Sequence, residues 1–311
     1  MNARAMKTLA KSGWHRCFVL LQRLGINLLP EHFYSAIPNL ADLGRRTDWR
    51  KPRSMYGINQ RSIEGQLALL GEWVGPHSDY LAGRAPHDSA IEGGGGDGGY
   101  GEIEADVLFG FIASRQPRRV MQIGCGVSTA VMLMAAAKAG YKPEIVCIEP
   151  YPSAWLRDAE AQGLIRLIAE PAQVVDFNVI AGLDRDDLLF VDSTHAVKPG
   201  SEVNYLIHEV LPRLQDGVWV HFHDIYFPYD YTRDALDGDM LFPQESTLLY
   251  AFLAGNARYR LEASLSMVHY AASQGLKRLI PKYQPNDQTD GLRGRNGKHF
   301  PSSAWLSVVA A

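Results

Sequence analysis

One glycine-containing stretch constrains the fold of this chain more than any other feature of the sequence. It reads Val120-Met-Gln-Ile-Gly-Cys-Gly-Val-Ser-Thr129, which predicts a buried strand, a tight turn and the start of a helix. Gly124 and Gly126 lack the Cβ atoms that would keep the backbone from passing close beneath a ligand. The two hydroxyl residues that follow can cap a helix predicted at residues 130–137. Taken alone, a Gly-x-Gly stretch is equally compatible with a simple tight turn.

An acidic residue after the next predicted strand indicates what the turn could bind. The apolar run Ile145-Val-Cys-Ile148 ends at Glu149, whose carboxylate can accept hydrogen bonds from two ribose hydroxyls. A dinucleotide fingerprint would place a third glycine where Thr129 stands, and a pyrophosphate needs exposed helix N–H groups, whereas this turn is short. The pattern therefore favours a phosphate-free nucleoside, such as S-adenosylmethionine, over a dinucleotide.

Apolar strands alternate with helical patterns along the rest of the chain. Strands are predicted at Arg119–Ile123, Ile145–Glu149, Ile165–Ala169, Leu188–Asp192, Val218–His223, Tyr259–Ser264 and Ser303–Val309. Helices are predicted at Arg61–Val74, Ile103–Ser114, Val203–Leu214 and Glu245–Ala254. Apolar strands separated by helices indicate a parallel sheet that is covered on both faces.

Four motifs in this order carry a resemblance to a known family. They are Gln122-Ile-Gly-Cys-Gly-Val-Ser-Thr-Ala, Ile148-Glu-Pro, Leu189-Phe-Val-Asp-Ser-Thr-His195 and Gly217-Val-Trp-Val-His-Phe-His-Asp-Ile225. The chain resembles class I S-adenosylmethionine-dependent methyltransferases, most of all the bacterial small-molecule branch related to catechol and caffeoyl-CoA O-methyltransferases. The resemblance covers about residues 99–265 and the last strand. It implies an α/β, Rossmann-like, doubly wound seven-stranded sheet, mostly parallel with an antiparallel C-terminal strand.

The predicted domain organisation has three parts. Residues 1–90 form an N-terminal helical extension or cap, and 91–101 form a glycine-rich connector. Residues 102–311 form the S-adenosylmethionine-binding methyltransferase domain, with a lid around 225–245. The connector is interpreted as a plain linker or as a hinge that closes over the cofactor. The aromatic residues of the lid segment either stack on a substrate or pack inside the protein.

Composition and charge limit the expected cellular location of the protein and the kinds of partner that it can bind. Hydrophobic residues make up 46% of the chain and charged residues 21%, as in ordinary globular enzymes. A net charge of −3 without a basic block in the core region argues against nucleic acid as a partner. No apolar run is long enough for an integral membrane span. The three cysteines show no pairing or metal-binding spacing, which predicts a cytoplasmic protein.

The first thirty residues form a separate prediction. Basic and apolar residues interleave there with helical spacing, and the short apolar core does not fit a signal peptide. We expect an amphipathic helix that packs on the domain or on a second subunit, so that a homo-oligomer is one prediction. Binding to a membrane surface is the alternative.

Candidate cofactor-binding residues follow from the position of ligands in open parallel sheets, beyond the carboxyl ends of the strands. Together with the resemblance, this rule predicts that S-adenosylmethionine contacts Tyr100, Gln122, Gly124, Gly126, Ser128, Glu149, Glu170 and Asp192. Glu170 falls where the family holds the adenine, and Tyr100 belongs to a segment that in related enzymes covers the methionine end.

The candidate catalytic residues are His223, His195 and Asp192, and two mechanisms stay open. In metal-dependent catechol-type enzymes an Asp after strand four and an Asp-Asn pair after strand five hold a divalent cation. The resemblance places Asp192, His223 and Asp224 at these positions, where they could bind Mg²⁺, Mn²⁺ or a transition metal that lowers the pKa of the substrate hydroxyl. Without a metal, a histidine would act as general base for the methyl transfer, with His223 preferred over His195.

The predicted function is transfer of a methyl group from S-adenosylmethionine to a hydroxyl of a small-molecule acceptor, with an amine as a less favoured acceptor. The acceptor is expected to be a metabolite, natural product or sugar. The first alternative is a nicotinamide-dependent oxidoreductase on a Rossmann-like sheet. The second is a nucleoside-binding module without catalysis.

Overall fold

The computed structural model of the chain describes residues 3–96, 99–233, 235–236, 241–286 and 298–310. Contacts divide the chain into two compact units, Met1–Thr47 and Asp48–Ala311. The predicted extension of residues 1–90 thus falls partly in each unit, and each unit is described by itself.

The first unit contains the predicted N-terminal helix and little packing of its own. Helix α1 spans Ala3–Gln22, and the short helix α2 spans Leu40–Arg45. Asn39 begins α2 by accepting a hydrogen bond from the backbone N–H of Asp42, 3.0 Å away. None of the α2 residues is buried, and the Phe33 side chain is 94% exposed. What this unit packs against therefore stays a prediction.

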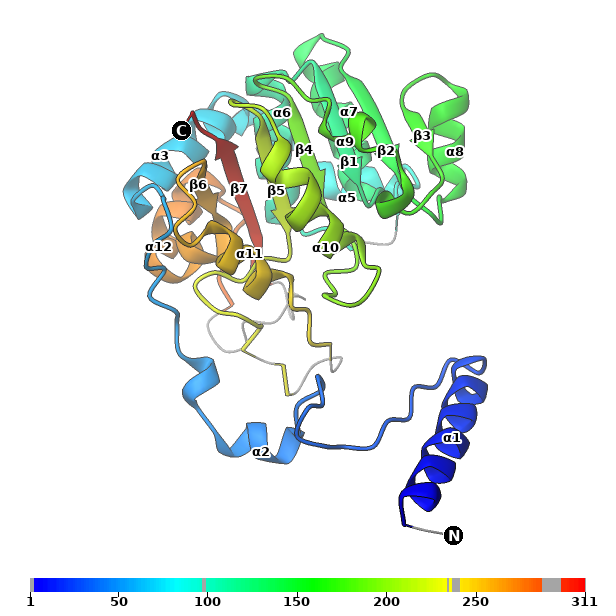
Figure 1. Cartoon of the computed structure of the whole chain (residues 1–311). Helices are drawn as coiled ribbons and strands as arrows, with labels where there is room; N and C mark the ends of the chain where they lie inside the picture. The colour runs from blue at the N-terminus through cyan, green and yellow to red at the C-terminus, as the bar shows by residue number, and fades with distance from the viewer. Residues whose placement is uncertain (1–2, 97–98, 234, 237–240, 287–297, 311) are drawn as a thin grey trace. The chain divides into compact units, whose positions relative to one another are not determined.

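The second unit is built on the predicted seven-stranded sheet (Figure 1). Its strands are β1 Arg119–Ile123, β2 Glu144–Ile148, β3 Arg166–Ile168, β4 Leu188–Val191, β5 Trp219–His223, β6 Tyr259–Ser264 and β7 Ser303–Val308. Their order across the sheet is β3-β2-β1-β4-β5-β7-β6. Neighbours among β1 to β5 pair in parallel, whereas β7 runs antiparallel to both β5 and β6. The predicted fold class is confirmed, and the strand ends differ from the prediction by no more than a residue or so.

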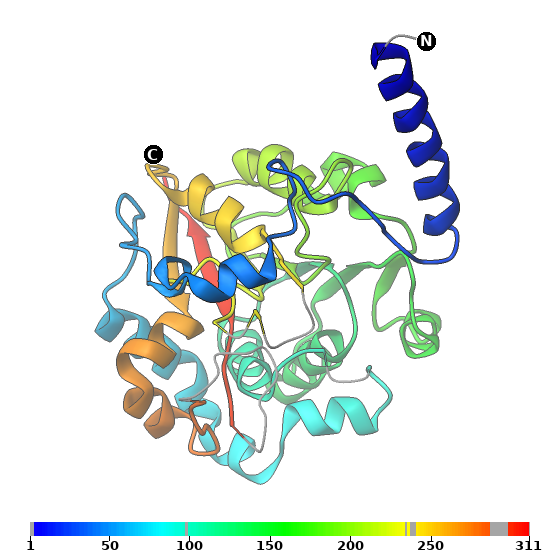
Figure 2. The ribbon, with the colours of Figure 1, turned by 90° about the horizontal axis from the view of Figure 1, so that it is seen from below.

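Helices cover both faces of this sheet, as Figure 2 shows, where the cyan helices and the yellow-green helices lie on opposite sides of the strands. The α-helices are α3 Ile63–Val74, α4 Ser78–Gly83, α5 Pro86–Glu92, α6 Glu102–Arg115, α7 Val127–Ala139, α8 Ala154–Ala161, α9 Phe177–Ala181, α10 Glu202–Tyr205, α11 Glu245–Leu253 and α12 Leu265–Leu279. Apolar residues of α3, α6, α7 and α12 form one core, and those of α9, α11 and the segment after α10 form the other. Successive side chains of a strand point to opposite faces of the sheet, so one strand contributes to both cores. Phe190, for example, belongs to the first core and Val191 to the second.

Two helical predictions need correction. The helix predicted at Val203–Leu214 changes its winding, because α10 continues as a π-helical segment, Leu206–Val210, and a 3₁₀ turn, Leu211–Arg213. Helix α12 was not predicted at all. Its backbone is non-helical at Ala272, and Gly275 packs closely against Leu67 of α3.

The described part of the predicted connector lies beside the glycine-containing turn. Helix α5 extends through Glu92, so the connector begins later than predicted. A Cβ atom on Gly95 would meet the Ala130 side chain at 3.0 Å, and one on Gly126 would meet the Gly95 carbonyl oxygen at 3.1 Å. The connector therefore packs on the start of α7. Residues 97 and 98 lie outside the described residues.

Across the described ranges, no helix is both long and apolar enough to cross a membrane.

Candidate functional site

The predicted site residues gather where the parallel strands end. Strands β2 and β3 lie on one side of β1, and β4 and β5 lie on the other side. The strand order therefore reverses at β1. Ligands of open α/β sheets bind in the crevice outside such a reversal. Two groups of residues border this crevice: the glycine turn, residues 124–126, and a set of charged side chains from β4, β5 and α11.

The glycine turn needs Gly124 for a reason that the sequence did not reveal. Gly124 has φ +79°, and a Cβ atom there would lie 1.6 Å from the carbonyl oxygen of Asp192. The Asp192 backbone N–H in turn donates to the carbonyl oxygen of Ile123 over 2.9 Å. The turn is therefore fitted to the end of β4 before any ligand is considered.

Side chains around the glycine turn form hydrogen bonds with one another and with the backbone of the turn. The Gln122 amide donates to the Ser128 hydroxyl over 2.8 Å and to the Gly124 carbonyl over 3.1 Å. The Thr129 hydroxyl donates to the side-chain Oε1 atom of Gln122 over 2.9 Å and accepts from the Gly126 N–H over 3.1 Å. Gln122, Ser128 and Thr129 are all buried. Of the predicted cofactor residues, Gln122 and Ser128 thus hold the turn in shape.

Two acidic residues predicted to hold the nucleoside differ in their surroundings. Glu149 follows β2, and its two carboxylate oxygens accept from the N–H groups of Cys125 at 3.3 Å and Tyr151 at 2.9 Å. Its carboxylate is thereby fixed next to the glycine turn. Glu170 is exposed and follows the short edge strand β3. The roles of both residues in cofactor binding remain predictions.

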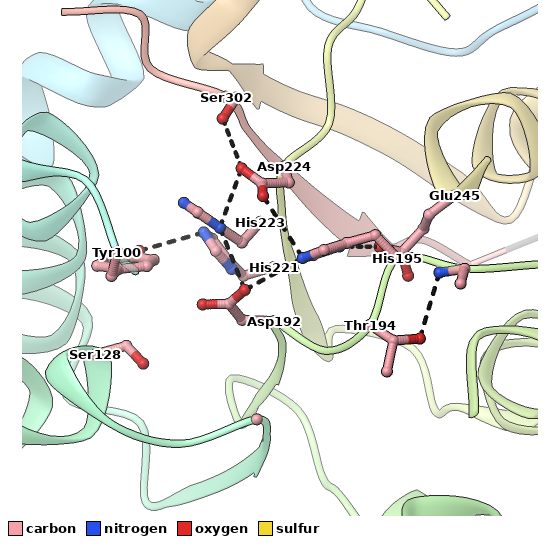
Figure 3. A network of polar contacts seen from close by, with 12 residues as sticks. Tyr100, Ser128, Asp192, Thr194, His195, His221, His223, Asp224, Glu245 and Ser302 are labelled. Carbon is pink, nitrogen blue, oxygen red and sulfur yellow. Dashed lines mark hydrogen bonds and ion pairs between the residues drawn. The ribbon is translucent and has the colours of Figure 1, made fainter. Parts of the chain in front are cut away.

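The structure brings the predicted catalytic and metal-binding residues together (Figure 3). With one further residue they form what we call the acid–histidine cluster: Asp192, His195, His223, Asp224 and Glu245. The His223 Nδ1 atom lies 3.3 Å from Asp192 Oδ1 and 3.3 Å from Asp224 Oδ1. The His195 Nε2 atom lies 3.5 Å from Asp192 Oδ1 and 3.6 Å from Asp224 Oδ2.

Glu245 is the member of this cluster that sequence reasoning missed. Its side chain is only 1% exposed, and its Oε2 atom lies 2.7 Å from His195 Nδ1. The His195 carbonyl also accepts from the backbone N–H groups of Gln244 and Glu245 at the start of α11. Fifty positions separate the two side chains in sequence, and the contact depends on how α11 docks. The only available signal was an acidic residue opening a predicted helix.

A second layer of buried groups lies behind His223. The Tyr100 ring packs on the His223 ring with 4.7 Å between centroids, and its hydroxyl lies 3.5 Å from His221 Nε2. His221 stacks on Phe190 with 4.3 Å between centroids and is fully buried, as expected for a core histidine. Tyr100, predicted to cover the cofactor, is thus packed beneath the cluster and is 2% exposed.

Electrostatics in the cluster favour the charged forms of His223, His195 and Asp192, whereas burial raises the pKa of Glu245. Burial disfavours the imidazolium of His223, but the carboxylates of Asp224 and Asp192 outweigh burial and raise its pKa to about 9. The pKa of His195 is likewise raised well above its ordinary value, because hydrogen bonds to Asp192 and Glu245 outweigh burial. Burial also opposes the charge of Asp192, yet the two histidines hold its pKa far below the usual range. For His221, burial and then the charge of His223 lower the pKa.

The segment predicted as a lid begins inside the protein. Tyr226 and Phe227 are each 1% exposed, so these two rings pack in the interior rather than over a substrate. Asp230 lies further along, where it accepts hydrogen bonds from the Arg53 guanidinium, 2.8 Å away at Nε. Residues 234 and 237–240 of this segment lie outside the described residues.

The fold and the site together define the class. A doubly wound sheet, a glycine turn after β1 and an acidic residue after β2 are the parts of a nucleoside-binding α/β protein, and the polar cluster at β4 and β5 adds reactive groups.

Comparisons with known proteins identify the family. Residues 121–225 match the methyltransferase domain family. The chain is 31% identical over 170 residues to an uncharacterised protein of Archaeoglobus fulgidus, a match that covers 50% of this chain and 74% of that protein. The chain therefore belongs to the same family as the Archaeoglobus fulgidus protein, and its residues 121–225 carry a methyltransferase domain.

Two solved structures are similar to this chain over most of its length. The methyltransferase PaMTH1 of Podospora anserina, bound to S-adenosylhomocysteine, is 17% identical, with 76% of this chain and 93% of that chain covered and a TM-score of 0.38. The plantazolicin methyltransferase BpumL, also in complex with S-adenosylhomocysteine, is 13% identical, with 80% and 96% covered and a TM-score of 0.37.

Proposed function

We propose that the protein transfers the methyl group of S-adenosylmethionine to a hydroxyl of a small-molecule acceptor at the acid–histidine cluster. The observation that carries this proposal is the meeting of Asp192, His195 and His223 at the strand ends, next to the glycine turn. These groups can bind the acceptor hydroxyl and accept its proton. Methyl transfer needs both functions in addition to the alignment of the acceptor with the methyl group. An amine acceptor is the less favoured alternative.

The residues of the glycine turn and of β2 would hold the cofactor. The carboxylate of Glu149 lies beside the turn, where it can accept hydrogen bonds from the ribose hydroxyls. Gly124 and Gly126 let the turn pack closely against Asp192 and Gly95, while Gln122 and Ser128 keep the turn in that shape. S-adenosylmethionine, when bound, supplies an electrophilic methyl group on a sulfonium and leaves as S-adenosylhomocysteine.

His223 would accept the proton of the acceptor hydroxyl, and the oxygen would then form the new bond to carbon as the carbon–sulfur bond breaks. Its ring is 4% exposed and is held between Tyr100 and the carboxylates of Asp192 and Asp224. Only the neutral imidazole can take the proton. The carboxylates that raise its pKa therefore make the reaction favour alkaline pH.

The test is turnover with S-adenosylmethionine against a panel of hydroxylated and amino small molecules, followed by mass spectrometry of the methylated product. We expect a methyl ether to form, and His223→Ala to lower kcat by about 100-fold, as for loss of a general base. The exposed His208, in the segment Leu206–Val210, is the matched control, because His208→Ala should leave kcat unchanged. A methylated amine would refute the hydroxyl acceptor, and full activity of His223→Ala would refute the base.

The same assay separates the two alternative functions. Hydride transfer with a nicotinamide cofactor and no product from S-adenosylmethionine would favour an oxidoreductase. Binding of S-adenosylhomocysteine without turnover on any acceptor would favour a binding module.

A further inference from the structure

We propose that Asp192, His195 and His223 form a site for a divalent first-row transition metal, with Glu245 orienting His195 as a ligand. This proposal goes beyond the methyltransferase activity and does not depend on it. It also departs from the metal site that the family resemblance implies, which would use Asp192, His223 and Asp224.

The first argument is the spacing of the donor atoms. One donor atom from each of Asp192, His195 and His223 lies within 4.8 Å of the other two. The Oδ1 atom of Asp192 lies 3.3 Å from His223 Nδ1 and 3.5 Å from His195 Nε2. Ligand atoms that each bind one ion at about 2.1 Å are roughly 3 to 3.5 Å apart, so the carboxylate oxygen and the two ring nitrogens are spaced as ligands.

The second argument is the state of His223. This side chain is 4% exposed, yet within the described residues neither of its ring nitrogens makes a hydrogen bond. The Nδ1 atom lies 3.3 Å from one oxygen of Asp192 and one of Asp224, yet it makes a hydrogen bond to neither, and a buried nitrogen in this position requires an explanation. A metal ion bound at Nδ1, on the side that faces Asp192, supplies the partner.

The third argument is the arrangement of His195. Its Nδ1 atom lies 2.7 Å from the buried Glu245 carboxylate, so Nε2 is the ring nitrogen that faces Asp192 and would bind a metal after losing its proton (Figure 3). Metal-binding histidines usually donate their second N–H to a carboxylate in this way, which fixes the tautomer and the ring. The backbone of His195 is itself held in the left-handed region, with φ +56°.

The ligand set also indicates which metal would bind. Asp224 has its Oδ1 atom engaged by the Ser302 hydroxyl over 3.0 Å, and its Oδ2 atom lies 3.6 Å from His195 Nε2. Its Oδ1 atom also lies 3.3 Å from His223 Nδ1, but the group whose donor atoms all lie within 4.8 Å of one another is Asp192, His195 and His223, so we assign the third ligand position to His195. Two imidazoles and one carboxylate suit Zn²⁺, Co²⁺, Fe²⁺ or Mn²⁺, whereas Mg²⁺ prefers oxygen ligands.

The experiment is a metal titration of the untagged full-length protein after chelation and dialysis, without S-adenosylmethionine. Binding of Co²⁺ is followed by its visible absorption, and Zn²⁺ and Mg²⁺ are added as competitors. We expect one Co²⁺ per chain, displaced by Zn²⁺ at equal concentration but not by Mg²⁺ at about 100-fold excess. Because absorption reports ligation directly, failure here would leave the methyltransferase proposal standing.

Variants assign the ligands. His195→Ala and His223→Ala should each weaken Co²⁺ binding by about 100-fold or more, and Glu245→Gln, which acts through His195, by about tenfold. Asp224→Asn should change affinity by less than about threefold, and His208→Ala should have no effect. Circular dichroism checks that each variant is folded.

Several results would overturn the proposal. They are displacement of Co²⁺ by Mg²⁺, unchanged binding in the His195 and His223 variants, or a loss in Asp224→Asn as large as that in His195→Ala. The last result would return the site to Asp192, His223 and Asp224.

Discussion

The glycine turn and the acid–histidine cluster border the same crevice but are built in opposite ways. Around the turn, Gln122, Ser128 and Thr129 use their side chains to hydrogen-bond one another and the backbone. In the cluster, both ring nitrogens of His223 and one oxygen of Glu245 are buried without a hydrogen-bond partner within the described chain. The side chains around the turn form their hydrogen bonds without a ligand, whereas the cluster has polar atoms that remain available to bind one.

Because of this difference, we expect the glycine turn and the acid–histidine cluster to respond differently to substitution. Changes in the turn remove interactions that hold the fold, so they should lower stability first. Changes in the cluster remove groups that face a ligand, so they should alter binding, turnover and pH dependence with less effect on stability.

The largest expected effect is on the turn. Gly124→Ala would place a Cβ atom 1.6 Å from the Asp192 carbonyl oxygen at a residue with φ +79°. We expect the free energy of unfolding to fall by at least about 4 kcal/mol, measured by urea denaturation, because either β4 or the turn must move.

Gly140 is the matched control for this substitution. It ends α7, has φ +72° and has open space where a Cβ atom would stand. Gly140→Ala should therefore cost only the backbone strain, about 1 to 2 kcal/mol. Equal losses in the two variants would show that the approach of Asp192 does not govern the turn.

The next effect is the pH dependence of turnover in metal-free protein. With the pKa of His223 at about 9, the imidazole is mostly protonated at pH 7, and the neutral base appears as the pH rises. We expect kcat/KM for the acceptor to rise by roughly tenfold per pH unit from pH 7 and to level off near pH 9. Asp192→Asn removes one of the carboxylates that raise this pKa, so its profile should shift toward lower pH. A profile that is flat above pH 7 would contradict the role of His223 as base.

Much of the fold could be predicted from the sequence because its signals are local. The strands are short apolar runs, and helices α3 and α6 contain many buried apolar residues, so both were located to within a few residues. Helix α12, which was not predicted, is kinked at Ala272. The length of the connector was overestimated because α5 continues to Glu92.

The site could be predicted only in part, since some of its contacts join distant segments. Asp192, His195, His223 and Asp224 directly follow or end adjacent strands, so the sheet itself brings them together. The pairing of Glu245 with His195 depends on the docking of α11, and that of Ser302 with Asp224 on the entry of β7. Neither pairing has a local pattern that a sequence could show.

The most direct test of the central claim is calorimetric titration of the protein with S-adenosylhomocysteine, with Glu149→Ala and Glu144→Ala measured alongside. Glu144 is an exposed carboxylate at the other end of the same strand, β2. We predict one binding site per chain, affinity about tenfold lower in Glu149→Ala, and no change in Glu144→Ala, because only Glu149 lies beside the glycine turn. Absence of binding to the wild-type protein, or equal affinity in the Glu149 variant, would contradict the account.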